Sequence, residues 1–253
     1  MISTGNTILI TGGGSGIGRG LAEALHALGN QIIIAGRRQQ QLDETTAANP
    51  GMKSMVFDVQ DPTSIRSLAD QVATSFPRLN VLFNNAGIRR GENLLAQQDD
   101  LADAEATVAT NLLGPIRLTA ALLPLLQRQP RATILNVSSA LAFVPLTLRP
   151  AYCATKAAIH SYTQSLRYQC RSTAIEVLEL IPPYVATDLM GGKNDPRAMP
   201  LKEFIAEVIA ILTTQPTPAE ICVERAKGLR FAAESGRYES AFQGMNAAME
   251  NTH

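Results

Sequence analysis

The sequence alternates short apolar runs with longer amphipathic segments along most of its length. Short apolar runs are predicted as strands, and segments whose apolar residues recur every three to four positions are predicted as helices. Strands are expected over 7–10, 31–35, 54–57, 81–83, 133–137 and 175–180, and helices over 62–75, 101–127 and 152–171. Unbroken apolar strands between helices are typical of parallel sheets. The predicted fold is α/β, a doubly wound parallel sheet of six to seven strands with helices on both faces.

No Pro-, Gly- or Ser-rich linker interrupts this alternation before residue 190, so 1–253 is expected to form a single domain. Residues 190–218 place glycines and prolines around one amphipathic helix, after the sixth strand, where the carboxyl edge of such a sheet binds ligands. They are predicted to form a substrate lid with glycine hinges, the alternative being an ordinary surface helix with loops. Residues 219–253 are predicted to be mostly helical, and a seventh strand is left open.

Composition excludes several classes of protein. Lys plus Arg and Asp plus Glu both number 22, so the chain has no basic excess of the kind that nucleic-acid binding needs. The longest apolar run, 120–126, is far shorter than the roughly 20 residues of a membrane-spanning helix. No Lys or Arg precedes Arg19, and Cys153, Cys170 and Cys222 are widely spaced. We therefore expect a cytoplasmic protein with reduced thiols, no metal site, and neither nucleic acid nor membrane as a partner.

A glycine-rich turn joins the first strand to the first helix. Its pattern is TGxxxGxG, with glycines at Gly12, Gly16 and Gly18, and the more widely quoted GxGxxG does not fit. Glycines at such a turn let the backbone approach a pyrophosphate, which then faces the amide groups of the helix N-terminus. The predicted dinucleotide contacts within the turn are Gly12, Gly14, Ser15, Gly16, Ile17 and Gly18. The alternative is a flexible turn without a ligand.

The end of the second strand predicts which dinucleotide binds. An acidic residue at this place bonds a free ribose 2′-hydroxyl, whereas a basic residue accommodates a 2′-phosphate. The chain has Arg37 and Arg38 there and no Asp or Glu. Guanidinium groups pair well with phosphate, so NADP(H) is favoured over NAD(H). The alternative is that both arginines are solvated residues at the start of a helix.

Tyr152 and Lys156 are four residues apart and share one face of the predicted helix. A tyrosine ordinarily has a pKa near ~10. A nearby ammonium favours the phenolate, so Lys156 is expected to lower the pKa of Tyr152 toward the range useful for acid–base catalysis. Ser139 follows the fifth strand, at the sheet edge where reactive groups gather, and could donate a hydrogen bond to a substrate carbonyl.

In this order and spacing, the motifs closely resemble those of the short-chain dehydrogenase/reductase family, in its short branch with a single Rossmann-type domain. The resemblance covers about residues 7 to 190. Its motifs are Thr11 to Gly18, Asp58-Val59, Asn84-Asn85-Ala86-Gly87, Asn111, Ser139, and Tyr152 with Lys156. The family resemblance implies a nicotinamide-dependent oxidoreductase, in which the cofactor supplies the hydride and the protein aligns it.

The resemblance also implies roles for single residues. Asn111, Ser139, Tyr152 and Lys156 would form the catalytic set. Tyr152 would exchange the proton, Ser139 would orient the carbonyl, Lys156 would bind the nicotinamide ribose, and Asn111 would hold a water that connects Lys156 to solvent. Further implied cofactor contacts are Asp58 and Val59 at the adenine, Asn84, Asn85, Ala86 and Gly87 at the ribose and central strands, and Pro182, Val185 and Thr187 beside the nicotinamide.

Two features depart from the family pattern. Pro183 replaces the usual glycine after the sixth strand and cannot adopt a positive φ, so the nicotinamide loop is expected to run differently. The C-terminus reads as largely helical from Glu220 to Met249, where many members have a seventh strand and a glycine-rich tail. Together these features resemble the DltE-like subfamily. A homodimer or homotetramer is implied by the resemblance, although the altered ending puts the usual tetramer in doubt.

The expected substrate is a mostly hydrophobic ketone, aldehyde or secondary alcohol, because the expected pocket walls are mostly apolar. These walls are Ala140, Leu141, Phe143, Val144, Pro145, Tyr184, Met190 and the lid. Arg89, Arg90 and Arg149 could instead attract a carboxylate near the entrance. Two further functions remain open, an NAD-linked dehydrogenase and a non-catalytic nucleotide-sensing or scaffolding protein on the same fold.

Overall fold

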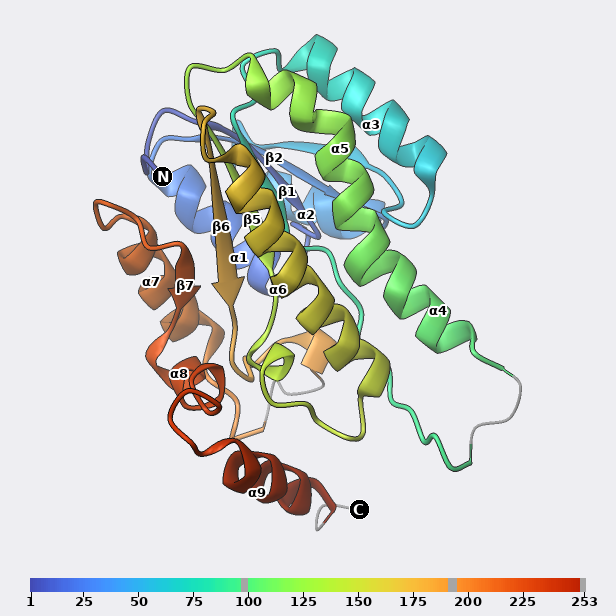
Figure 1. The fold of residues 1–253 in the computed structure, drawn as a ribbon. Coiled ribbons are helices and arrows are strands. Elements are labelled where there is room, and N and C mark those ends of the chain that lie inside the picture. Colours follow the sequence, from blue (N-terminus) through green and yellow to red (C-terminus); the bar gives the residue numbers. More distant parts are fainter. Residues whose placement is uncertain (97–99, 191–194, 251–253) are drawn as a thin grey trace.

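A computed structural model describes residues 1–96, 100–190 and 195–250, which contain a seven-stranded, fully parallel sheet in the order β3-β2-β1-β4-β5-β6-β7 (Figure 1). The strands are β1 (Thr7–Thr11), β2 (Gln31–Gly36), β3 (Lys53–Val56), β4 (Val81–Asn84), β5 (Ala132–Val137), β6 (Ile175–Ile181) and β7 (Glu220–Cys222). This confirms the predicted α/β fold class. The strand order reverses direction between β1 and β4, and sheets of this kind bind ligands in the crevice at such a point.

Helices cover both faces of the sheet. They are α1 (Gly16–Ala27), α2 (Gln39–Ala48), α3 (Pro62–Ser75), α4 (Ala102–Val108), α5 (Gly114–Gln127), α6 (Pro150–Cys170), α7 (Leu201–Leu212), α8 (Glu224–Arg230) and α9 (Tyr238–Glu250). Apolar residues of α1, α2, α7 and α8 share one core cluster with the sheet, and those of α3, α5 and α6 share the other. Neighbouring residues of β1 divide between the clusters, Ile8 and Ile10 joining the first and Leu9 the second. Burial on both faces explains why the central strands are rich in apolar residues.

The helix expected over 101–127 contains a π-helical turn, η1 (Ala109–Leu113), between α4 and α5. Gly114 follows this turn and packs so closely against Val59 that an added Cβ would lie 2.5 Å from Val59 Cγ2. By length and composition, 102–127 could cross a membrane. Core helices of soluble proteins have the same composition, and here Leu118 and Leu122 are buried in the core cluster that α5 shares with the sheet.

The C-terminal part differs from the sequence prediction at its beginning. Glu220 starts strand β7, which pairs in parallel with β6, and helical structure begins only at Glu224. The prediction of a helical segment from Glu220 onward was therefore wrong for these first residues, because pairing with β6 outweighs a weak local preference. A seventh strand does form.

Helix α7 lies within the segment predicted to be a lid. It buries Phe204, Val208 and Leu212 in the core cluster, and Gly20 of α1 approaches it so closely that an added Cβ would lie 2.8 Å from Ile205 Cγ1. The helix is therefore a packed element of the layer that covers the sheet. The covering role of 190–218 stays a prediction, and the hinge residues Gly191 and Gly192 lie outside the described residues.

Candidate active site

A cavity of about 390 Å³ opens at the carboxyl ends of the strands and gathers most of the predicted site residues. Its lining includes Gly12, Gly14, Ser15, Gly16, Ile17, Gly18, Arg37, Arg38, Val59, Asn85, Ala86, Gly87, Ser139, Tyr152, Lys156, Pro182, Val185 and Thr187. Residues that the sequence did not point to complete it, namely Gly36, Gln41, Leu42, Phe57, Ile88, Thr110, Val137, Ser138, Asp188 and Leu189, together with Pro183. One cavity therefore joins the glycine-rich turn to the proposed catalytic groups.

The glycine-rich turn is held in place by residues that directly follow β4. Gly12 and Gly16 have φ values of +68° and +52°, a region that disfavours other residues. A Cβ on Gly18 would overlap both Asn85 Nδ2 and the Gly12 carbonyl oxygen. Asn85 Nδ2 donates to the Thr11 carbonyl at 2.8 Å, and Thr11 Oγ1 accepts from the amides of Asn85 and Ala86. This bare backbone cradle fits a dinucleotide pyrophosphate.

Two guanidinium groups lie at the end of β2. Arg37 and Arg38 are exposed and line the cavity, and Arg38 Nη2 donates to Ser15 Oγ at 2.9 Å. This bond connects the arginine pair to the glycine-rich turn. The arrangement provides positive charge beside the cradle, as a phosphate on the adenosine ribose would require.

Ser139, Tyr152 and Lys156 converge on the cavity although they are nearly buried, with 4%, 5% and 6% of their surfaces exposed. Lys156 Nζ donates to the Val137 carbonyl at 2.8 Å and lies 5.7 Å from the centroid of the Tyr152 ring. Ser139 precedes a short 3-10 turn, η2 (Ala140–Ala142), and its Oγ accepts from the Leu141 amide. The first turns of α6 and the end of β5 thus place a hydroxyl, a phenol and an ammonium together.

Burial sets the acid–base properties of this group. Burial raises the pKa of Tyr152, while a hydrogen bond with Ser139 and the positive charge of Arg89 act in the opposite direction. The expectation that the pKa of Tyr152 falls below its ordinary value was therefore wrong, because the effect of burial is larger than the effects that lower it. Burial also lowers the pKa of Lys156 to about 8, against the opposing effect of the negative charge of Glu179.

Asn111 and Asp58 lie behind the cavity wall. Asn111, within η1, donates from Nδ2 to the Ile88 carbonyl at 2.8 Å and accepts from the Ile88 amide at 2.9 Å. Its side chain therefore holds the backbone of a cavity-lining residue. Asp58 Oδ1 accepts from the Gln60 amide and shapes the turn after β3. The water-holding role of Asn111 and the adenine contact of Asp58 stay predictions. Asn84 is buried and donates to Asn136, which links β4 to β5.

The residues expected to form the apolar walls of a substrate pocket do not share one environment. Ala140 and Val144 are buried, Phe143 stacks its edge on His160, and Tyr184 donates from its hydroxyl to Asp195 Oδ2 at 3.1 Å. These positions and the neighbouring Leu141 and Pro145 do not line this cavity, so their role as walls of a substrate pocket stays a prediction. The short turn η2 after β5 packs against α6 and α8. The Met190 side chain lies outside the described residues.

The C-terminal helix α9 reaches Tyr152, which is about 90 positions earlier in the sequence. Met245 packs against a small cluster that contains Leu146, Tyr152 and Cys153. Asn246 Oδ1 accepts from the Thr147 amide at 2.8 Å, and its Nδ2 donates to the Pro145 carbonyl. No local pattern in the sequence pointed to this contact, because about 100 residues separate its partners.

A nucleotide cradle and a hydroxyl–phenol–ammonium group in one cavity define a nicotinamide-dependent oxidoreductase site, and comparison with known proteins agrees. The family model for short chain dehydrogenase matches residues 6–198, so the chain belongs to the short-chain dehydrogenase/reductase family. It is 38% identical to a protein of Bacillus subtilis (strain 168) named uncharacterized oxidoreductase DltE, over 97% of this chain and 98% of that one.

Two other similar proteins add to this picture. The chain is 32% identical to sulfoacetaldehyde reductase 2 of Chromohalobacter salexigens, over 72% of this chain and 73% of that one. The crystal structure of a short-chain dehydrogenase from Streptomyces avermitilis superposes with a TM-score of 0.80 at 26% identity, covering 98% of this chain and 99% of that one.

Proposed function

We propose that the protein is an NADPH-dependent carbonyl reductase, or alcohol dehydrogenase in the reverse direction. Its substrate would be a mostly hydrophobic ketone, aldehyde or secondary alcohol. The observation that carries the proposal is the common cavity, which the glycine-rich turn shares with Ser139, Tyr152 and Lys156. A nucleotide-sensing protein on the same fold would need the cradle but not the buried phenol and ammonium beside it.

When bound, the nicotinamide cofactor supplies or accepts the hydride. In reduction, the Tyr152 phenol gives its proton to the substrate carbonyl oxygen, and the Ser139 hydroxyl orients that oxygen. The raised pKa of Tyr152 keeps the phenol protonated at neutral pH, as a proton donor must be. The Lys156 ammonium, 5.7 Å from the Tyr152 ring centroid, stabilises the phenolate that remains.

The test of this function is a cofactor-coupled screen. NADPH and NADH oxidation would be followed with a panel of ketones and aldehydes, and dissociation constants measured for both dinucleotides. We expect turnover with NADPH and tighter binding of NADPH than of NADH. Tighter NADH binding would favour the NAD-linked dehydrogenase, and tight NADPH binding without turnover across the panel would favour the nucleotide-sensing protein.

We expect Arg37→Asp to move cofactor preference toward NADH. The substitution removes one guanidinium from the cavity and puts a carboxylate where the 2′-phosphate would lie. Loss of a charge-assisted hydrogen bond of about 1.5–3 kcal/mol lowers the NADPH-to-NADH affinity ratio roughly 10- to 100-fold. Direct titration of both dinucleotides measures this ratio. Arg78→Asp, at an exposed position outside the cavity, is the matched control and should leave the ratio unchanged. An unchanged ratio in both variants would remove the basis for choosing NADPH.

One observation favours an acidic group on the substrate as a second candidate class. Arg89 follows the cavity residue Ile88. Burial and the nearby charge of Arg149 lower the pKa of Arg89, while the charges of Tyr152 and Tyr184 raise it. Arg149 Nε is buried and has no hydrogen-bond partner among the described residues. The similar protein of Chromohalobacter salexigens is named for a sulfonated aldehyde. The screen should therefore include each carbonyl compound with and without a carboxylate or sulfonate.

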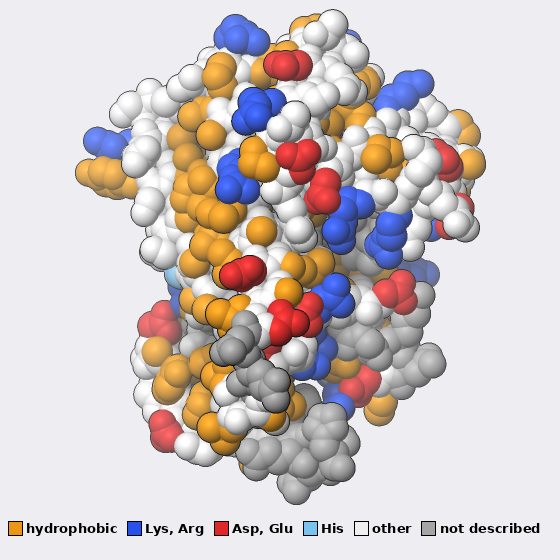
Figure 2. Space-filling view, turned by 90° about the vertical axis from the view of Figure 1, so that its right-hand side faces the viewer, with side chains coloured by type: hydrophobic (Ala, Val, Ile, Leu, Met, Phe, Trp, Pro, Cys, Tyr) orange, Lys and Arg blue, Asp and Glu red, His pale blue; other side chains and the backbone are white. Residues whose placement is uncertain are grey.

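We also propose a cytoplasmic homodimer or homotetramer that associates through α4, α5 and α6. Leu101, Val108, Leu113 and Tyr168 are exposed on or beside these helices. Figure 2 looks onto the side of the molecule that bears α4 and α5, where hydrophobic side chains form a strip among charged ones. Light scattering would distinguish a monomer, a dimer and a tetramer.

A further inference from the structure

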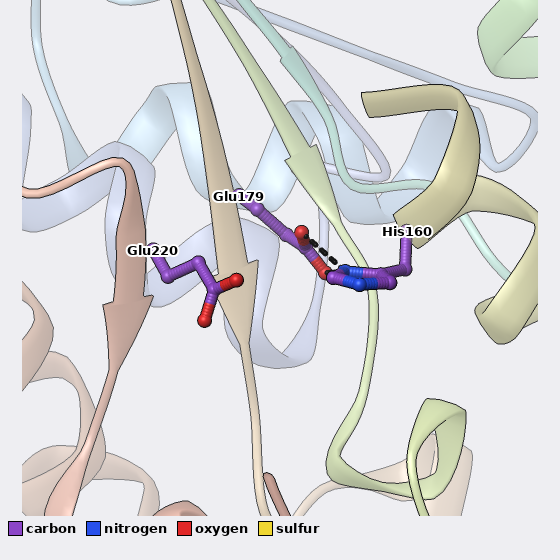
Figure 3. Close-up of side chains that lie close together, drawn as sticks. All are labelled: His160, Glu179 and Glu220. Atoms are coloured by element: carbon purple, nitrogen blue, oxygen red, sulfur yellow. Dashed lines mark hydrogen bonds and ion pairs between the residues drawn. The ribbon is translucent and has the colours of Figure 1, made fainter. Parts of the chain in front are cut away.

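A fully buried carboxylate lies close to the active-site lysine. Glu179, in the middle of β6, has no exposed surface and pairs in register with Asn136 on one side and Glu220 on the other. Its carboxylate points toward α6, where it meets His160 (Figure 3). His160 is one helical turn after Lys156 on the same helix, so both side chains share the face that packs on the sheet.

His160 holds the Glu179 carboxylate in place. Its Nδ1 lies 2.8 Å from Oε2 and 3.0 Å from Oε1. An ionised carboxylate can only accept, so the proton of this bond is on Nδ1. The amide nitrogen of Gln164 lies 3.1 Å from His160 Nε2, and since an amide nitrogen donates, Nε2 is the acceptor. The Phe143 ring packs edge-on against the imidazole at 4.7 Å. Both ring nitrogens are thereby satisfied in the neutral imidazole.

The other charged groups nearby are already paired. Ligand atoms of His160, Glu179 and Glu220 lie within 4.8 Å of one another, which suggests a metal site at first sight. Arg230 of α8, however, donates to both Glu220 oxygens, at 2.7 and 3.0 Å, and to Glu234 at 2.7 Å. The Glu220 charge is neutralised by this guanidinium, and a cation would have to displace it. Within the described part of the chain, Glu179 has no such arginine.

The geometry brings Lys156 to the part of β6 that carries Glu179. Lys156 Nζ donates to the Val137 carbonyl at 2.8 Å, and Val137 of β5 pairs in register with Leu180, the residue after Glu179 in β6. Burial lowers the pKa of Lys156 to about 8. The negative charge of Glu179 acts in the opposite direction, because it favours the protonated amine. Glu179 is fully buried and Lys156 is nearly so. Charges interact more strongly in the protein interior than at its surface. A buried carboxylate is also costly unless it is paired and hydrogen-bonded. Lys156 supplies the opposite charge and His160 supplies the hydrogen bond, both from one face of α6.

We propose that Glu179, oriented by His160, is a positioning residue that serves as the counter-charge of Lys156 and keeps this lysine protonated in the active site. Its catalytic consequence rests on the proposed reductase function, in which the ammonium stabilises the Tyr152 phenolate. The charge of Lys156 itself can be measured without turnover.

The direct test is an NMR titration of the protein labelled with ¹³Cε-lysine. The chain has only five lysines, so the Lys156 signal can be assigned by its loss in Lys156→Met. We expect Glu179→Gln to lower the titration midpoint of Lys156 by about one pH unit, a tenfold weaker proton affinity. Glu176→Gln removes a partly exposed carboxylate from the same strand and should leave the midpoint unchanged. Equal midpoints in the wild type and Glu179→Gln would overturn the proposal.

Variants at His160 keep the test decisive if Glu179→Gln does not fold. His160→Leu leaves the buried carboxylate without the donor that orients it, so its effect on Lys156 should weaken and the Lys156 midpoint should fall as in Glu179→Gln. His160→Gln retains an amide donor and should restore a midpoint close to that of the wild type. A midpoint that is the same in both His160 variants would contradict the orienting role.

Kinetics then separate this proposal from the reductase function. The alkaline limb of kcat/KM for carbonyl reduction should move to lower pH in Glu179→Gln by the same amount as the NMR midpoint. Wild-type protein that shows the Lys156–Glu179 coupling but turns over no carbonyl compound would overturn the function alone. Active protein whose alkaline limb does not move in Glu179→Gln would overturn the counter-charge alone.

Discussion

Tyr152→Phe is expected to lower kcat/KM for NADPH-dependent carbonyl reduction by roughly 10²- to 10⁴-fold, the usual contribution of a positioned general acid. The substitution removes one oxygen from a ring that is 5% exposed and leaves the packing with Leu146 and Cys153 in place. NADPH affinity and thermal stability should therefore change little. The measurement is steady-state NADPH oxidation with the best substrate from the screen, together with NADPH titration.

Tyr168→Phe is the matched control for this variant. Tyr168 lies on the same helix, 67% exposed, with Arg171 over its ring. Its hydroxyl is remote from the cavity, so the control should keep wild-type activity. Equal rates in Tyr152→Phe and wild type would contradict the proton-donor role and the reductase function together.

Gly18→Ala should weaken NADPH binding by about 10- to 100-fold, the second large effect that we expect. The new Cβ would overlap Asn85 Nδ2 and the Gly12 carbonyl, so either the Asn85 bond to Thr11 or the turn at Gly12 must shift. Overpacking of this kind typically costs about 1–3 kcal/mol of folding free energy. Because the chain has no Trp, the fluorescence of NADPH itself can report binding with little background, and thermal denaturation reports stability.

Gly228→Ala provides the control for the added methyl group. Gly228 lies within α8, where an added Cβ would meet no atom within 4 Å apart from its chain neighbours and its own helix backbone, and alanine favours helix by about 1 kcal/mol over glycine. This variant should bind NADPH as the wild type does and melt at the same or a higher temperature. If Gly18→Ala behaved in the same way, the close approach at the turn would not matter for binding.

The fold could be predicted where local pattern and tertiary structure agree. Strands β1, β2 and β4 to β6 are mostly buried and rich in apolar residues, and that pattern is visible in the sequence itself. Strand β7 has only three residues and exists because β6 offers it a partner. The π-helical turn η1 was equally invisible, since its surroundings include the close contact of Gly114 with Val59, 55 positions earlier in the chain. Contacts between distant residues decide both.

In the site, too, local features could be predicted and features that depend on distant contacts could not. The glycine-rich turn and the Tyr152–Lys156 spacing are local, and the cavity brings them together as the resemblance implied. The direction of the Tyr152 pKa was not predictable, because it depends on how deeply α6 is buried. The Glu179–His160 bond joins a strand to a helix across 19 positions, and neither residue belongs to a motif. Sequence spacing thus indicated which groups meet, whereas their protonation required the packed structure.

Helix α9 shows how such an enzyme can diversify. Met245 and Asn246 belong to the last residues of the described chain, yet they touch the cluster around Tyr152 and hold the backbone at Pro145 and Thr147. The described side chains of α9 do not line the cavity that the glycine-rich turn shares with Tyr152. Substitutions in this tail can therefore change the surroundings of the Tyr152 phenol while the glycine-rich turn stays unchanged, which makes the tail the natural place to begin directed evolution of selectivity.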